Sequence, residues 1–362
     1  MTKRRGVSTD LFADSICGDW PPCYNMALNK IQLLVLLCAA IEIFAGGRGT
    51  TPLIKNVQKG GVHFEGPHWA EDENALYWVD IQAQKTYRLD WASGNITSKT
   101  IEYGPVSLVV RVKDYPKLLL ISARSELYFM PWDGPEGDSS LRLLSVVDLG
   151  LPDNRFNDGK VDAKGRLWAG TMGKETDGEV DLDQGSLYLV TQENHLHPKV
   201  VLKPVSVSNG IAWTADNKYM FYIDTPTRNI DVFNFDLETG SIRNRRTLFS
   251  FQANNITGLP DGMTIDTDGN LWIACFNGGQ VIKIDSRAGK LLEQHKLPAS
   301  KVTSVMWGGS DYSTLFVTTS KVGLNSIQLT QEPEAGSLYA IENTGCKGLP
   351  QNQFVFTNAD KY

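Results

Sequence analysis

Six polar residues recur along the chain, and each carries an oxygen atom that could bind a cation. They are Glu65, Ser107, Asn157, Asn209, Asp261 and Ser304. Each stands roughly ten to twelve residues before a hydrophobic anchor, and the anchors are Leu76, Leu119, Leu167, Met220, Leu271 and Leu315. Carboxylate, carboxamide and hydroxyl oxygens without Cys or His favour Ca²⁺, Mg²⁺ or Mn²⁺ over Zn²⁺ or Cu²⁺. The alternative is that these polar residues, often followed by Gly, only mark turns where strands begin.

The segments around these residues repeat one pattern, a short strand, a tight turn and a second strand. The clearest copy runs from Leu259 to Asp266, turns through Asp266-Thr267-Asp268-Gly269 and continues from Leu271 to Ala274. Six copies with a period of roughly 43 to 53 residues are typical of β-propeller blades. The sequence therefore predicts an all-β protein, with one six-bladed β-propeller domain over residues 53–358. Since equivalent positions of the blades surround one channel, the six polar side chains are expected to converge there.

The densest polar cluster is Asn154-Arg155-Phe156-Asn157-Asp158-Gly159-Lys160. Arg155 precedes Asn157 by two residues, so on a strand both side chains point to the same face. An Arg beside a metal in the channel could bind a substrate hydroxyl, carboxylate or phosphate. A structural ion pair is the alternative for Arg155. The cluster does not fit an EF-hand, because Arg155 falls where that loop needs an oxygen ligand.

Other kinds of site receive little support. His63 and Glu65 would share a strand face, but by the same parity His68 faces away, which argues against zinc. The chain has no Gly-x-Ser-x-Gly motif and no Gly-rich phosphate loop, so a metal-assisted reaction is favoured over a serine nucleophile. Two long connections, 175–185 and 321–336, are expected to shape the mouth of a pocket, although the acidic first one could be a solvated loop.

The first fifty residues are of a different kind. A basic residue, an apolar run from Ile31 to Ala45 and the small residues that follow predict a secretory signal over about residues 26–47. We therefore expect a secreted protein, with a cytoplasmic one as the alternative if the segment in this N-terminal extension (1–50) is not a functional signal but an amphipathic or buried helix. The run is short for a membrane span. Whether the chain starts at Met1 or Met26 stays open. A net charge of −6 argues against a nucleic-acid partner, and a monomer is expected.

Several motifs together resemble one known family. They are Glu65-Gly66-Pro67-His68-Trp69, Asn154 to Asp162, Ala169-Gly170-Thr171-Met172, Ser208-Asn209-Gly210, Tyr222-Ile223-Asp224, Pro260-Asp261-Gly262-Met263 and Gly308-Gly309. Over about residues 53–350 the chain resembles the senescence marker protein, regucalcin and gluconolactonase family, which includes the insect luciferin-regenerating enzymes. The resemblance implies a six-bladed propeller with one divalent cation in its channel. The signal-like segment is a departure, because the better-known animal members look cytosolic.

The resemblance also implies roles for individual residues. Glu65, Asn209 and Asp261 match the family's metal-binding positions, with Asn157 close by. Arg155, Asn157 and Glu175 match its substrate-binding positions, although Glu175 lies in a segment, 172–176, that is less acidic than usual. Asp261 also matches the residue that orients or deprotonates the attacking water.

The resulting hypothesis is divalent-metal-dependent hydrolysis of a sugar lactone, a small molecule such as gluconolactone. The cation is expected to be Ca²⁺, with Zn²⁺, Mg²⁺ or Mn²⁺ as alternatives. One rival is a non-catalytic calcium-binding or calcium-regulatory protein on the same scaffold. The other is a hydrolase of the luciferin-regenerating type that acts on a different substrate at the same site.

Overall fold

A computed structural model describes residues 51–176 and 178–359. The predicted N-terminal extension and its signal-like segment lie outside the described residues. Within the described ranges, no helix has the length and apolar character needed to cross a membrane.

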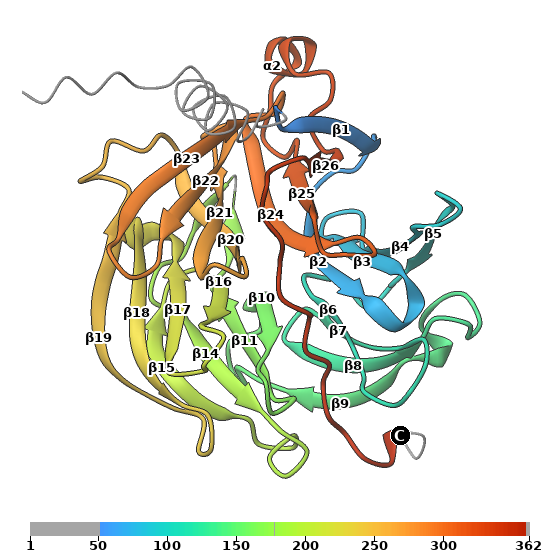
Figure 1. The fold of residues 1–362 in the computed structure, drawn as a ribbon. Coiled ribbons are helices and arrows are strands. Elements are labelled where there is room, and N and C mark those ends of the chain that lie inside the picture. The colour runs from blue at the N-terminus through green and yellow to red at the C-terminus, as the bar shows by residue number, and fades with distance from the viewer. Residues whose placement is uncertain (1–50, 177, 360–362) are drawn as a thin grey trace, which may run out of the picture. The chain divides into compact units, whose positions relative to one another are not determined.

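Six antiparallel four-stranded sheets form the blades of a β-propeller, which confirms the predicted fold (Figure 1). Blade 1 contains β2 (Phe64–Ala70), β3 (Ala75–Asp80), β4 (Lys85–Asp90) and β5 (Ile96–Thr100). Blade 2 contains β6 (Val109–Arg111), β7 (Leu118–Ala123), β8 (Glu126–Pro131) and β9 (Arg142–Val146). Blade 3 contains β10 (Arg155–Val161), β11 (Leu167–Met172), β14 (Gly185–Val190) and β15 (Lys199–Val205).

Blade 4 contains β16 (Ser208–Trp213), β17 (Tyr219–Asp224), β18 (Asn229–Asp236) and β19 (Ser241–Ser250). Blade 5 contains β20 (Leu259–Ile265), β21 (Asn270–Phe276), β22 (Gln280–Asp285) and β23 (Lys290–Lys296). Blade 6 contains β24 (Lys301–Gly308), β25 (Thr314–Ser320), β26 (Leu338–Glu342) and β1 (Leu53–Gln58). The smaller elements are β12 (Glu175–Thr176), β13 (Glu179–Val180), α2 (Ser326–Gln331) and the 3₁₀ turns Glu71–Glu73, Asp138–Ser140 and Thr225–Thr227.

The last blade is completed by the first strand of the described chain. β1 pairs antiparallel with β26, with Leu53 opposite Glu342, and the ammonium of Lys55 lies 2.7 Å from the Glu342 carboxylate. Counting repeats predicted six blades, but it did not predict this pairing. The pairing joins the two ends of the propeller, so that the blades form a closed ring.

Buried acidic residues explain why the turns between the first two strands of a blade are so well marked in the sequence. The Asp266 carboxylate accepts hydrogen bonds from the backbone N–H groups of Asp268 and Asn270, at 3.0 and 2.7 Å. It also accepts one from the Trp272 indole at 3.0 Å. Asp162 repeats this arrangement with Trp168 in blade 3. Each Asp thus ties a turn to the aromatic core beside it.

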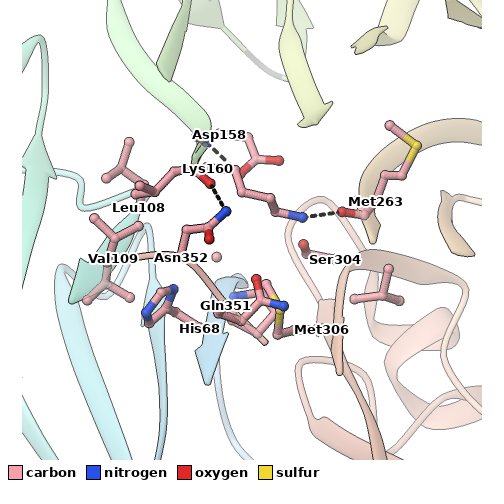
Figure 2. A pocket seen from close by; sticks show the side chains of 16 residues that line it. His68, Leu108, Val109, Asp158, Lys160, Met263, Ser304, Met306, Gln351 and Asn352 are labelled. Atoms are coloured by element: carbon pink, nitrogen blue, oxygen red, sulfur yellow. Dashed lines mark hydrogen bonds between the residues drawn. The ribbon is translucent and has the colours of Figure 1, made fainter. Parts of the chain in front are cut away.

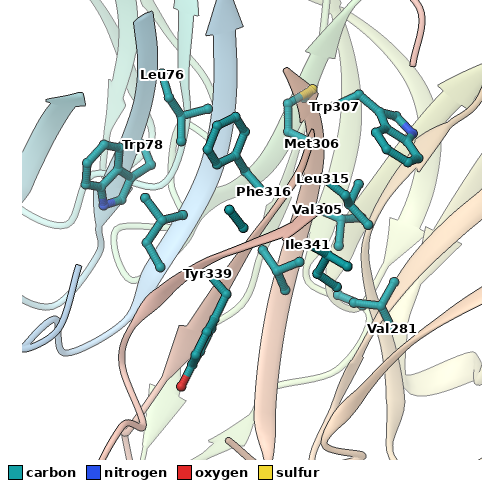
Figure 3. Close-up of a cluster of buried hydrophobic side chains, with 14 of the residues drawn as sticks. Leu76, Trp78, Val281, Val305, Met306, Trp307, Leu315, Phe316, Tyr339 and Ile341 are labelled. Atoms are coloured by element: carbon teal, nitrogen blue, oxygen red, sulfur yellow. The ribbon is translucent and has the colours of Figure 1, made fainter. Parts of the chain in front are cut away.

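The hydrophobic core lies between neighbouring blades. Figure 3 shows one of these interfaces, where side chains of blades 1, 5 and 6 meet. Trp69 of blade 1 stacks on Phe316 of blade 6 with ring centroids 5.9 Å apart, and Trp272 of blade 5 meets Trp307 edge-on at 5.1 Å. Large aromatic side chains thus bury apolar area between adjacent blades, together with the aliphatic residues of the same cluster.

The innermost strand of several blades is irregular at its candidate polar residue. Register shifts occur between Phe156 and Gly159, between Ser208 and Ile211, and between Pro260 and Met263. Blade 1 has the same irregularity between Glu65 and His68. A bulge of this kind bends a strand and redirects its side chains. The polar residues therefore lie within strands, and the alternative that they only mark turns is wrong for these four blades.

The glycine after a candidate polar residue allows the inner strands to approach closely. A Cβ atom on Gly210 would lie 2.6 Å from the Met263 Cβ and 2.7 Å from the Asp261 carbonyl oxygen. A Cβ atom on Gly262 would lie 2.1 Å from the Ser304 Oγ. These separations are far below van der Waals contact, so the spacing of blades 4, 5 and 6 around the channel depends on glycine at both positions.

We predict that Gly262→Ala lowers the free energy of unfolding by about 1–3 kcal/mol or more, because the added methyl group overpacks the contact with Ser304. Chemical denaturation followed by tryptophan fluorescence measures the change. Ser98→Ala, at an exposed position of β5, is the control and should leave stability almost unchanged. Equal stability of the Gly262 variant and the parent protein would contradict this account of the channel.

Candidate functional site

An open cavity of about 940 Å³ lies where the inner strands begin. The cavity brings together all six residues predicted for the site, namely Glu65, Arg155, Asn157, Glu175, Asn209 and Asp261. They come from blades 1, 3, 4 and 5 and from the β12–β13 hairpin. Residues far apart in the sequence thus meet as the repeat predicted. Their roles as ligands, substrate contacts or base stay predictions.

Two of the six repeating polar residues, Ser107 and Ser304, do not line this cavity. The prediction of a ring of six oxygen donors was therefore wrong for these two. The hydroxyl of Ser107 donates to the Phe156 carbonyl at 2.8 Å and lies 2.9 Å from the Ser122 hydroxyl. Ser304 lines a different, smaller cavity. A serine side chain is short and bonds readily to nearby groups, so these two side chains serve the packing of the blades.

That smaller cavity lies further along the channel, and Figure 2 shows Asp158 and Lys160 beside residues of the C-terminal segment. The Lys160 ammonium donates to the Met263 carbonyl at 2.6 Å. Asn352 donates to the Val161 carbonyl at 3.2 Å and, together with Gln351, lines this cavity. Neither Asp158 nor the C-terminal segment was predicted from the sequence to take part in a site. Asp158 falls one residue after the repeat position shared by Asn157 and Asp261, so the repeat gave no signal for it.

Buried carboxylates hold the starts of the strands that carry Glu65 and Asn209. The Asp80 carboxylate accepts hydrogen bonds from the N–H groups of Val62 and His63, at 2.8 and 3.0 Å. Asp224 does the same for Ser206 and Val207, at 3.2 and 2.9 Å. In both blades the acid lies at the end of the second strand. These bonds therefore fix the backbone just before each candidate ligand.

Arg155 is held firmly on the cavity wall. Its guanidinium donates to the Asn157 Oδ1 at 2.9 Å and to the Phe156 carbonyl at 3.1 Å, and it lies 3.4 Å from a Glu175 carboxylate oxygen. The Asn157 amide in turn donates to the Ser208 carbonyl at 3.0 Å. The ion pair weighed as an alternative for Arg155 is thus present, and it lies inside the cavity. Because the Asn157 Oδ1 already accepts a hydrogen bond from Arg155, Asn157 is better placed to orient Arg155 than to bind a metal.

The amide of Asn209 has one group paired and one left over. Its Nδ2 donates to the Thr225 hydroxyl at 3.0 Å, and that hydroxyl donates its only proton to the Pro260 carbonyl at 2.9 Å. Thr225 can therefore only accept from Asn209, which fixes the orientation of the amide. The Asn209 Oδ1 is buried and has no hydrogen-bond partner in the described part of the chain. A buried carbonyl oxygen without a partner is costly, and a cation would satisfy it.

The two carboxylates repel each other in a buried setting. Burial, and then the charges of Asp261 and Asp158, raise the pKa of Glu65 well above its usual value. Burial, and then the charge of Asp158, raise the pKa of Asp261 in the same way. A divalent cation between these groups would offset both effects. Two carboxylates and an amide oxygen suit a hard cation, so the residues present fit the predicted metal.

The histidines do not complete a zinc site. His63 lines the large cavity, and burial lowers its pKa to about 3, so it is neutral at physiological pH. His68 lines the small cavity and lies 3.3 Å from the Arg111 backbone N–H, which donates to its Nε2. The predicted separation of the two is confirmed. Residues 51–176 and 178–359 contain no group of three or more His, Cys, Asp or Glu side chains that could hold a metal.

Both long connections reach the cavity, as expected. Glu175, Glu179 and Leu182 line it from the acidic connection, where β12 and β13 form a small hairpin. Val322 and Gly323 line it from the other connection, which also contains the short helix α2. The acidic connection is therefore part of the wall of the cavity and is more than a solvated loop.

A six-bladed propeller with a polar cavity at one end of its channel defines the class of protein. Residues 64–321 match the family described as "SMP-30/Gluconolactonase/LRE-like region". Regucalcin of Bos taurus is 40% identical over 287 residues, which cover 79% of this chain and 92% of the relative. The chain belongs to this family.

Solved structures agree with this assignment. The structure of a luciferin-regenerating enzyme superposes with a TM-score of 0.79 at 31% identity and covers 84% of this chain and 100% of that one. A calcium-binding protein, regucalcin, from Agrobacterium tumefaciens gives a TM-score of 0.73 at 24% identity, with 83% and 96% covered. At that identity the second similarity supports the fold alone.

We predict opposite effects of Asp261→Asn on stability with and without a cation. Without a cation, the raised pKa values mean that the native protein binds protons more tightly than the unfolded chain. Stability of the parent protein should therefore fall as pH rises above the ordinary carboxyl range near about 4. Asp261→Asn should weaken this fall and stabilise the cation-free protein at neutral pH.

With Ca²⁺ the order should reverse. At a concentration of about 100 Kd the parent protein should gain about 2.7 kcal/mol, and Asp261→Asn should lose most of that gain. Thermal unfolding in chelator and in Ca²⁺ at several pH values measures both effects. Asp268→Asn, at an exposed turn of the same blade, is the control. If Ca²⁺ stabilised Asp261→Asn as much as the parent protein, Asp261 would be ruled out as a ligand.

Proposed function

We propose that the protein is a divalent-metal-dependent hydrolase that opens a sugar lactone, with its cation held by Glu65, Asn209 and Asp261. The observation that carries the proposal is the buried Asn209 Oδ1, which has no partner among the described residues and lines one cavity with two repelling carboxylates. The family description, which includes gluconolactonase, supports the reaction class. When bound, the cation would polarise the lactone carbonyl and stabilise negative charge on its oxygen.

The residues of the chain supply the remaining requirements of the reaction. Asp261 is the proposed general base, because its carboxylate lines the cavity in which substrate and water would bind and can accept a proton from water there. Glu65 shares the cavity and balances the charge of the cation. The hydrogen bonds around Asn209 and Thr225 hold this side of the site in place before substrate arrives.

Arg155 and Asn157 are proposed to bind the substrate. The guanidinium has five N–H donors, and the bonds to Phe156, Asn157 and Glu175 leave part of this capacity for sugar hydroxyls or the lactone carbonyl. Because Glu175 and Asn157 fix its orientation, Arg155 loses little conformational freedom when substrate binds.

A second candidate function is calcium binding without catalysis. The name of the curated relatives, regucalcin, favours it, and the same donor set would serve it. A third, hydrolysis of a different substrate, is favoured by the similarity to a luciferin-regenerating enzyme. Acid release from a panel of lactones, in chelator and with Ca²⁺, Mg²⁺, Mn²⁺ or Zn²⁺, separates the three functions.

Secretion is also proposed, on the basis of the signal-like segment in the sequence. N-terminal sequencing of the native protein tests it, and it would also settle the choice between Met1 and Met26. An intact N-terminus at Met1 would contradict the proposal.

Asp261→Ala should lower kcat/KM for lactone opening by about 100-fold or more, because it removes both the proposed base and a ligand of the cation. Acid release in a pH-stat gives the rate, and circular dichroism checks the fold. Asp268→Ala, outside the cavity in the same blade, should keep full activity. Full activity of the Asp261 variant, or of the parent protein in chelator, would end the proposal.

Arg155→Lys should raise KM roughly tenfold and change kcat less, because lysine keeps the charge but loses the fork of donors held by Asn157 and Glu175. Steady-state kinetics on the same lactone gives both constants. An unchanged KM would show that Arg155 has only a structural role in the cavity wall and does not bind the substrate.

A further inference from the structure

Lys301 is a positive charge on the cavity wall to which the proposed mechanism gives no role. It begins β24 of blade 6 and lines the large cavity together with Gly323. Its ammonium lies 5.0 Å from the centroid of the Phe276 ring, and a Cβ atom on Gly323 would lie 3.5 Å from it. The side chain is thus packed between an aromatic ring and the 321–336 connection, with its charged end at the cavity.

The Lys301 ammonium makes no hydrogen bond or ion pair within the described ranges, and its nearest carboxylates are engaged elsewhere. Glu175 pairs with Arg155 at 3.4 Å. Glu332 accepts a hydrogen bond from the Ser300 N–H at 2.6 Å. Both act on Lys301 only through the longer-range electrostatic field, and burial lowers the pKa of Lys301. A half-buried ammonium with free donors gains much from an anionic partner.

Lys301 lies across the channel from Arg155. The blades follow one another around the ring in chain order, so blades 3 and 6 stand opposite each other. Arg155 belongs to blade 3 and Lys301 to blade 6, while Glu65, Asn209 and Asp261 come from blades 1, 4 and 5. A substrate whose lactone group is held by these residues can therefore extend one end towards Arg155 and the other towards Lys301.

We propose that Lys301 forms an anion subsite, which selects lactones of sugar acids that carry a second negative group remote from the lactone carbonyl. The shared chemistry is a terminal oxyanion, either a carboxylate, as in an aldaric acid lactone, or a phosphate ester. This inference rests on the proposed function, which it narrows to a substrate class. Arg155 is less suited to this task because Glu175 already neutralises it.

Equilibrium binding of open-chain sugar acids tests the subsite without turnover. Calorimetry with the full chain, at fixed ionic strength and one fixed concentration of divalent cation, compares D-gluconate with D-glucarate and 6-phosphogluconate. The parent protein should bind at least one of the two doubly acidic compounds about tenfold or more tightly than D-gluconate. Whether D-glucarate or 6-phosphogluconate binds tighter identifies the carboxylate or the phosphate as the preferred group.

The variants show whether Lys301 causes this preference. Lys301→Met should abolish it and leave the affinity for D-gluconate within about twofold, whereas Lys301→Arg should keep most of it. Lys290→Met, which removes an exposed lysine on β23 outside the cavity, controls for the loss of one positive charge. No preference in the parent protein, or equal losses for D-gluconate and the doubly acidic compounds in Lys301→Met, would overturn the proposal.

Turnover of the corresponding lactones then separates this proposal from the proposed function. Glucono-δ-lactone, D-glucaro-1,4-lactone and 6-phosphogluconolactone should show the same order in kcat/KM, again abolished by Lys301→Met. If no lactone is opened but the binding preference still depends on Lys301, the proposed function fails and the anion subsite stands. If lactones are opened without any dependence on Lys301, the subsite fails and the proposed function stands.

Discussion

Burial of like charges, those of Glu65 and Asp261 on the cavity with Asp158 near them, is the constraint on which the rest of this site depends. Such an arrangement persists only if the surrounding backbone cannot move the charges apart. The close contact of Gly262 with Ser304, the clamps made by Asp80 and Asp224 and the stacked aromatic rings between blades provide that resistance. The stability of the propeller thus keeps these buried carboxylates close together, and a bound cation would offset their repulsion.

The cavity wall combines groups that are already paired with groups that are not. Arg155, Asn157 and Thr225 belong to hydrogen-bond networks that fix their positions. The Asn209 Oδ1 and the Lys301 ammonium have no hydrogen-bond partner in the described part of the chain, so both can form new hydrogen bonds or ionic contacts. Fixed groups reduce the entropy lost on binding, and unused groups supply the new interactions. This division indicates which groups of the wall would contact the ligand directly and which would hold them in place.

Local periodicity made much of this structure predictable. The strand-turn-strand repeat predicted six blades, and the position of Glu65, Asn157, Asn209 and Asp261 in that repeat predicted a common cavity. The prediction failed for Ser107, whose hydroxyl bonds to the next blade. Contacts without a repeat signal could not be found in this way: the support from Thr225, the C-terminal residues in the channel and the pairing of β1 with β26 all join distant segments.

The pairing of Leu53 with Glu342 has a consequence for biosynthesis. During translation β1 leaves the ribosome early, whereas its partner β26 emerges only after nearly all other strands have been made. Until then the nascent chain exposes an unpaired strand and an open edge, both of which invite wrong association. Sealing of the ring is therefore a late event in folding, and a chain that terminates before β26 has no means of completing it.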